Sequence, residues 1–287
     1  MKYPTVVAGV LLSFAATGLR ALELQEQRTS PFDLAVTGRL AGQPEGSKRY
    51  ARWADLRALP TSELTVDGEF VKGPQQLTVV FLSDLWKALP IGDSADTFLA
   101  TCGDGYSATF TTAFIGQYRP FLVLEINGQG PEHWPPPGLN FNPGPFVITV
   151  STALVPAAAS FLDLEHKKPW AVTGIEIANF AERYRGIFSG NWASPPPAAD
   201  RGRTIWVNSC GSCHAGPPGT AGGTKADRPF PVIVAYAAYD SSFFRKYVRN
   251  PRSLVASAKM EAHPHYSDAQ LDDLIAFITL GPPPAGN

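Results

Sequence analysis

The stretch Cys210-Gly211-Ser212-Cys213-His214 decides the fold of the last part of this 287-residue chain. Two thiols three positions apart on a helical turn can each add to one vinyl group of a haem, and the imidazole that follows can bind the iron. The motif therefore predicts one covalently attached haem c. Cys210 and Cys213 would form the thioethers, and His214 would be an axial iron ligand.

Two other kinds of site also use a Cys-x-x-Cys pair. A zinc site needs a second ligand pair at suitable spacing, and the sequence contains none. A thioredoxin-like redox disulfide needs a strand before the pair and a helix after it. Here the pair ends a predicted helix, and glycine and proline follow it. The sequence therefore favours haem over both alternatives.

Met260 is the candidate for the second axial ligand. Apart from the initiator it is the only methionine in the chain, and it stands in the polar, loop-like stretch Lys259–Pro264. A methionine in such a place is a poor candidate for core filler. His/Met ligation raises the reduction potential of a haem and suits an electron carrier. His263 and His265 remain alternative ligands, or solvent-exposed loop residues.

Helical patterns surround the motif. Asp200 to Cys210, Ser242 to Asn250 and Ser267 to Leu280 are predicted helices, and Ser267 with Gln270 forms a capping box for the third. Residues 200 to 280 resemble a class I cytochrome c domain. The matching residues are Gly202 and Trp206 before the motif, Pro217 or Pro218 after it, Val248-Arg249-Asn250-Pro251 before the methionine, and Leu274 to Ile278 near the end. The resemblance implies that the first helix packs against the last.

The region from residue 30 to residue 185 reads as one β-rich domain. Its expected strands are Phe32 to Gly38, Thr97 to Cys102, Tyr106 to Phe114, Phe121 to Ile126, Phe146 to Val150 and Trp170 to Ile177. Short helices are expected at Trp53 to Leu59 and Ser83 to Leu89, the second with Ser83 as N-cap. The layout resembles the molybdopterin-binding domain of the sulfite oxidase superfamily. The expected fold class is α+β, a mostly-β domain followed by an all-α cytochrome c domain.

This first domain departs from its relatives at the metal ligand. In active relatives a cysteine before the segment that matches Leu77 to Leu89 binds molybdenum, and no cysteine stands there. Cys102 comes after it and is expected to be a buried structural thiol. Arg119, His133 and His166 are expected to be surface loop residues. The sequence therefore argues against a molybdopterin and predicts a domain without a cofactor or catalytic residue.

Two further segments indicate the cellular location and the domain organisation of the protein. Residues 1–21 read as a signal peptide, with Lys2 before the apolar run Val6 to Leu19, which is short for a membrane span. Export to the periplasm would agree with covalent haem attachment. Residues 186–199 contain Pro195-Pro196-Pro197 and predict a stiff linker with few contacts, which leaves 200–287 as the haem domain.

Charge says little about partners. The net charge is −1, which gives no electrostatic case for nucleic-acid binding. Five cations near Met260 form either a solvated face or a docking patch for an acidic redox partner, and these are Arg245, Lys246, Arg249, Arg252 and Lys259. We expect a periplasmic electron-transfer protein. The alternatives are a molybdenum sulfite dehydrogenase-like enzyme with a fused haem domain, and a haem subunit of a larger membrane-associated complex.

Overall fold

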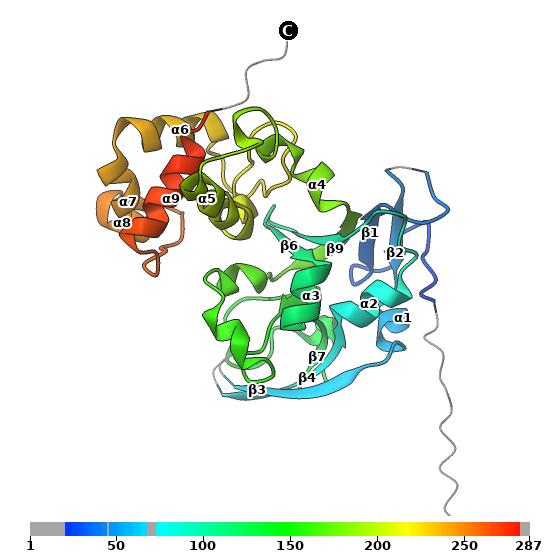
Figure 1. The fold of residues 1–287 in the computed structure, drawn as a ribbon. Coiled ribbons are helices and arrows are strands. Elements are labelled where there is room, and N and C mark those ends of the chain that lie inside the picture. The colour runs from blue at the N-terminus through cyan, green and yellow to red at the C-terminus, as the bar shows by residue number, and fades with distance from the viewer. Residues whose placement is uncertain (1–20, 45, 68–72, 282–287) are drawn as a thin grey trace, which may run out of the picture.

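A computed structural model describes residues 21–44, 46–67 and 73–281. A sheet-rich region precedes a helical region, and the two lie against each other (Figure 1). The predicted signal peptide falls outside the described residues except for Ala21. Among the helices in the described ranges, none has the length and apolar character needed to cross a membrane.

Two sheets make up the first region. The larger has the strand order β2-β1-β9-β5-β6 and the smaller the order β3-β4-β7-β8. Only the β1–β9 pair is parallel among the pairs between these described strands. The strands are β1 (Leu34–Gly38), β2 (Lys48–Ala51), β3 (Ser62–Asp67), β4 (Pro74–Phe81), β5 (Thr97–Cys102), β6 (Ser107–Thr111), β7 (Phe121–Ile126), β8 (Val147–Thr149) and β9 (Val172–Ala178).

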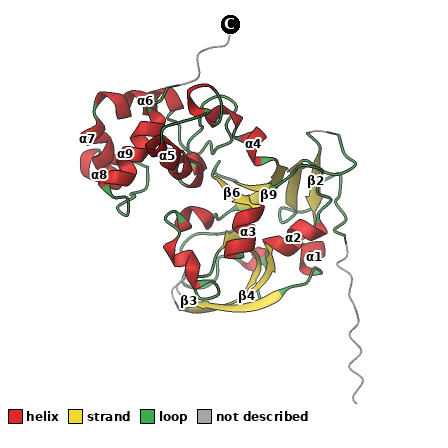
Figure 2. Cartoon of the chain, in the orientation of Figure 1, coloured by secondary structure: helices red, strands yellow, loops and turns green. Residues whose placement is uncertain are grey.

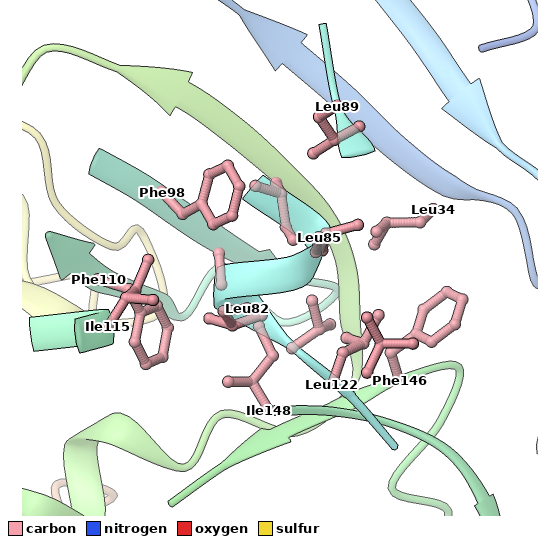
Figure 3. Close-up of a cluster of buried hydrophobic side chains, with 14 of the residues drawn as sticks. Leu34, Leu82, Leu85, Leu89, Phe98, Phe110, Ile115, Leu122, Phe146 and Ile148 are labelled. Atoms are coloured by element: carbon pink, nitrogen blue, oxygen red, sulfur yellow. The ribbon is translucent and has the colours of Figure 1, made fainter. Parts of the chain in front are cut away.

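Three short helices pack on the core of this region, namely α1 (Trp53–Arg57), α2 (Leu82–Ala88) and α3 (Thr112–Tyr118), whereas α4 (Phe180–Arg183) follows β9 and packs Phe180 against the core of the helical region. Leu82 and Leu85 of α2 share a buried cluster with side chains of both sheets (Figure 3). The predicted N-cap at Ser83 is wrong, because α2 begins one residue earlier and uses no side-chain cap. Instead, the Leu82 N–H donates to the Pro120 carbonyl at 2.9 Å, so the preceding strand runs directly into the helix.

The predicted hairpin is present as β5 and β6, paired from Thr97↔Thr111 to Thr101↔Ser107. Its second strand is shorter than expected because α3 begins at Thr112. The Thr111 hydroxyl accepts a hydrogen bond from the Phe114 N–H at 3.2 Å and caps that helix. The Gly103-Asp104-Gly105 turn points toward the helical region, where the Thr224 N–H donates to the Gly105 carbonyl at 2.8 Å.

The helical region contains α5 (Pro197–Asn208), α6 (Phe230–Tyr239), α7 (Ser241–Arg249), α8 (Pro251–Leu254) and α9 (Asp268–Ile278) (Figure 2). The predicted capping box at the start of α9 is present, with Ser267 and Gln270 bonded reciprocally. Leu271, Leu274 and Ile278 of α9 are completely buried, as the apolar spacing indicates. The α6 helix was not predicted from the sequence.

Residues 186–199 correct the prediction of a linker with few contacts. Trp192 is fully buried, its indole Nε1 donates to the Phe277 carbonyl at 3.1 Å, and its ring packs against Phe230. Ile187 is also completely buried in the core of the helical region. The proline run is short, and the large apolar side chains of Ile187 and Trp192 precede it. Burial of these side chains stabilises the fold, so the segment packs against the helical region instead of remaining extended.

Candidate functional site

The haem motif begins on the 3₁₀ turn Cys210–Ser212, one residue after the end of α5, and Cys213 and His214 follow the turn. The His214 N–H donates to the Cys210 carbonyl at 2.9 Å and closes this turn. Both cysteines are free thiols. Burial raises the pKa of Cys210 to about 12 and that of Cys213 to about 11, so both are held protonated. The backbone thus presents two thiols and an imidazole close together, as haem attachment requires.

The turn is positioned by a close crossing of α5 and α9. A Cβ atom on Gly202 would lie 1.9 Å from the Asp273 carbonyl oxygen and 2.9 Å from Leu274 Cα, so only glycine lets the two backbones touch here. One turn further on, the Trp206 ring packs against Phe277, with 6.1 Å between ring centroids. This is the packing of first helix on last that the resemblance implies.

Polar atoms without partners gather around the motif. Four buried side-chain atoms of the described helical region lack a hydrogen-bond partner: Trp206 Nε1, Ser209 Oγ, His214 Nδ1 and Thr220 Oγ1. Buried polar atoms in native proteins nearly always have partners, so a group of exceptions in one place calls for a physical explanation, and a bound group is one. The orphans surround the thiols, so the residues present fit a covalently held haem.

His214 is suited to bind iron through a neutral imidazole. Burial lowers the pKa of His214. The backbone at Arg228 faces the ring and partly opposes this effect, but it does not reach hydrogen-bond geometry with Nδ1. A neutral ring keeps a lone pair for a metal, which the charged ring lacks. The described residues contain no cluster of three or more His, Cys, Asp or Glu side chains that could hold a metal ion.

Met260 lies in the loop between α8 and α9 and packs, half-buried, against the core of the helical region. Of the two alternative ligands, His263 is the more enclosed. Burial lowers the pKa of His263 to about 4, and the nearby His265 and His214 rings lower it further. His265 is exposed and lies 3.8 Å from Asp163. The structure therefore places His263 near His214 and packs Met260 against the core that contains Trp206, and the sixth ligand stays a prediction.

The predicted basic cluster is partly neutralised within its own region. Arg245 pairs with Asp272, and Arg249 lies 2.7 Å from Asp268, both acids being on α9. The Arg252 guanidinium donates to the Ala258 carbonyl at 3.4 Å. Two of the five cations are thus engaged in ion pairs, which favours the interpretation of a solvated face over a docking patch.

The candidates in the first region have different environments. Cys102 is buried as expected, and burial raises the pKa of its thiol to about 12. Arg119 and His133 are exposed, as expected for loop residues. His166 is not a surface residue: its Nδ1 lies 3.0 Å from the Tyr106 hydroxyl, and its ring stacks on His263 at 5.2 Å between centroids.

Sequence reasoning missed the residues that join the two regions. Tyr266 is fully buried, and its hydroxyl donates to the Asp163 carboxylate. Lys225 pairs with Asp104 at 3.0 Å, and Thr109 shares a 2.6 Å hydrogen bond with Tyr184. These contacts join residues far apart in the chain, and no local pattern indicates them.

The family comparison agrees with this geometry. Residues 197–278 match the family model described as Cytochrome C oxidase, cbb3-type, subunit III. These residues form a cytochrome c domain. The match begins where α5 begins and ends where α9 ends, so it covers all the helices from α5 to α9 and supports haem-based electron transfer by this domain.

One solved structure similar to the chain is the sulfane dehydrogenase SoxCD from Paracoccus pantotrophus, at 13% identity and a TM-score of 0.35. The match covers 54% of this chain and 40% of that chain. No curated protein matches the chain. The sulfite oxidase-like fold of the region before the cytochrome c domain remains an expectation from the sequence.

Proposed function

We propose that this protein is an exported cytochrome with one haem c that passes single electrons between redox partners in the periplasm. The observation that carries the proposal is the segment from Cys210 to His214, which places two free thiols and an imidazole together beside unpartnered buried polar atoms. The bound haem would supply an iron that cycles between Fe(II) and Fe(III).

The residues of the chain have separate roles in this proposal. Cys210 and Cys213 would hold the haem covalently, and His214 and Met260 would be the ligands of its iron. The α5–α9 crossing and the buried Trp206 ring form an apolar core beside the motif, which would keep water from that side of a bound haem. A dry site and a thioether ligand both favour the reduced iron, which suits a carrier that accepts electrons readily.

The first region is proposed to bind no cofactor. Its described residues contain one cysteine, Cys102, and burial keeps that thiol protonated and unsuited to a metal. Metal analysis of the protein purified from its source distinguishes the alternatives. Iron alone supports the carrier, whereas stoichiometric molybdenum would support a sulfite dehydrogenase-like enzyme. Partners that co-purify from native membranes would place the chain in a larger complex.

Replacing Met260 tests the sixth ligand. Met260→Ala should keep the haem attached, because the thioethers do not involve this residue, and should lower the reduction potential on loss of the thioether ligand. Potentiometry and the Met–iron absorption band of the oxidised protein measure both effects. An unchanged potential and an unchanged band would show that Met260 is not an iron ligand, and His263 would then be the next candidate.

A further inference from the structure

The loop that carries Met260 has few supports of its own. It runs from Val255 to Ser267 between α8 and α9, and most of its residues are exposed. Near its start, Ala258 is buried and its carbonyl accepts a bond from Arg252. The remaining anchors lie at its end, where His263 and Tyr266 turn inward.

The strongest of these anchors reaches into the sheet-rich region. Tyr266 is 1% exposed and Asp163 is 4% exposed, and the tyrosine hydroxyl donates to the carboxylate. The two residues are 103 positions apart in the chain. His265 adds a weaker contact to the same carboxylate. A hydrogen bond to a buried charged group is among the stronger contacts a loop can make.

A second anchor lies beside the first. The backbone N–H of His263 donates to the Val248 carbonyl at 3.0 Å, which ties the residue to α7. The imidazole ring of His263 stacks on the ring of His166. His166 is itself fixed, because the Tyr106 hydroxyl lies 3.0 Å from its Nδ1 and 3.1 Å from its carbonyl oxygen.

These contacts lie against the haem motif. Asp163 is close enough to Cys210 to influence the pKa of that thiol, and Tyr106 is close enough to Cys213 for the cysteine to influence the tyrosine. The sheet-rich region, the loop end and the motif turn therefore meet at one place. Met260 lies three residues before His263 in the same loop, so a displacement of the loop end would also displace Met260.

We propose that the sheet-rich region holds the Met260 loop closed over the haem motif, with Asp163 and His166 as positioning residues. The proposal rests on the proposed function, since it assumes that Met260 binds the iron. It gives the first region a role that needs no cofactor: it sets how often the sixth ligand leaves the iron. The loop is then held by the fold of a different part of the chain.

The closed loop has a measurable consequence. An added ligand such as imidazole can bind the iron only when Met260 has left it, so its apparent affinity is proportional to the open fraction. Loss of one hydrogen bond to a charged group changes such an equilibrium by about tenfold. Weakening the anchor should therefore tighten apparent imidazole binding by about tenfold.

The test compares two tyrosines in the full haem-loaded chain. Tyr266→Phe removes the hydroxyl bonded to Asp163. Tyr184→Phe removes a hydroxyl that is also buried but whose hydrogen-bond partner, Thr109, belongs to β6 and not to the loop. Imidazole is titrated into each oxidised protein while the Met–iron band is followed. We expect about tenfold tighter apparent binding in Tyr266→Phe and a value within about twofold of wild type in Tyr184→Phe.

His166 provides a second pair of variants should Tyr266→Phe fail to fold. His166→Ala removes the stacking partner of His263 and should also tighten imidazole binding, whereas His166→Phe keeps an aromatic face and should restore the wild-type value. Equal imidazole affinity in wild type and all folded loop variants would overturn the proposal, as would an equal effect of Tyr184→Phe. Absence of the Met–iron band in the wild-type protein would instead show that Met260 does not bind the iron, and would contradict the proposed function on which this proposal rests.

Discussion

The two regions treat their buried polar groups differently. In the sheet-rich region, the buried Asp33 carboxylate accepts three hydrogen bonds from Thr29 and Ser30. The buried Thr78 hydroxyl lies 2.9 Å from a carboxylate oxygen of Glu63 and 2.9 Å from one of Glu125. Around the haem motif, four buried side-chain polar atoms lack partners, whereas among the described residues of the sheet-rich region one does, Thr149 Oγ1. Buried polar atoms are normally paired, so a group of four unpaired atoms in one place calls for a bound group to satisfy them. The difference locates function in the helical region and support in the other.

Removing the motif thiols should give the largest effect and should separate the two regions. In Cys210→Ser/Cys213→Ser no thioether can form, so covalent haem should be lost completely. The helical region should lose stability with it, while the sheet-rich region, whose core lacks these residues, should stay folded. The mass of the denatured protein reports haem, and limited proteolysis reports each region. Haem that stays covalently bound would contradict the assignment.

The α5–α9 crossing should be the next most sensitive point. Gly202→Ala places a methyl group 1.9 Å from the Asp273 carbonyl oxygen, so the helices must separate. Overpacking against backbone should lower the free energy of unfolding by about 3 kcal/mol. Denaturant unfolding of the purified protein measures this, and a loss below about 1 kcal/mol would mean that the helices separate easily.

Gly116 is the matched control in the other region. It lies within α3, and a Cβ atom there would meet nothing within 4 Å. Gly116→Ala should therefore raise the free energy of unfolding by about 0.5–1 kcal/mol, because alanine loses less backbone entropy in a helix. A lower free energy of unfolding in Gly202→Ala and a higher one in Gly116→Ala would support the contrast between a backbone crossing and an open helix face.

A smaller, pH-dependent effect is expected in the sheet-rich region. Lys167 is completely enclosed, and burial lowers its pKa to about 7, well below its usual 10.5. Between these values the unfolded chain carries a proton that the folded chain lacks. Raising the pH therefore favours folding, by up to about 1.4 kcal/mol per pH unit. Below pH 7 both states are protonated, and the slope vanishes.

Lys167→Met removes this titrating group and keeps an unbranched apolar stem. The free energy of unfolding of wild type, measured from pH 6 to 9, should rise above pH 7 relative to the variant. The hydrogen bond from Lys167 to the Thr109 carbonyl at 2.7 Å is lost in the variant at every pH, so it changes the offset between the curves and not their slopes. Parallel curves would show that Lys167 keeps its proton in the folded protein.

Features with a local signature could be predicted from the sequence. The motif turn, the capping box of α9 and the β5–β6 hairpin each depend on a few neighbouring residues, and all are present in the structure. Gly202 was also identified correctly, because the resemblance placed it at the helix crossing. In each of these cases, short-range chemistry determines the geometry.

The features that could not be predicted from the sequence depend on contacts between residues that are distant in the chain. The α6 helix is apolar along nearly its whole length, from Phe230 to Tyr239, so it shows no helical period. Trp192 stands near prolines that suggest an exposed linker, yet Phe230 and Phe277 bury it. His166 was interpreted as a surface residue because nothing near it in sequence indicates Tyr106 or His263. Only the fold brings these residues together.

The burial of Trp192 limits how the two regions could be exchanged as modules. A shortened chain that begins at Asp200 would leave an indole-sized hole beside Phe277 and would remove the hydrogen bond from the Trp192 indole to the Phe277 carbonyl. Losses of large aromatic side chains from a core cost about 3–5 kcal/mol, a large part of the stability of a small domain. Recombination at the proline run would therefore yield a defective haem unit. The transferable unit has to extend back at least to Tyr184, which also belongs to this core.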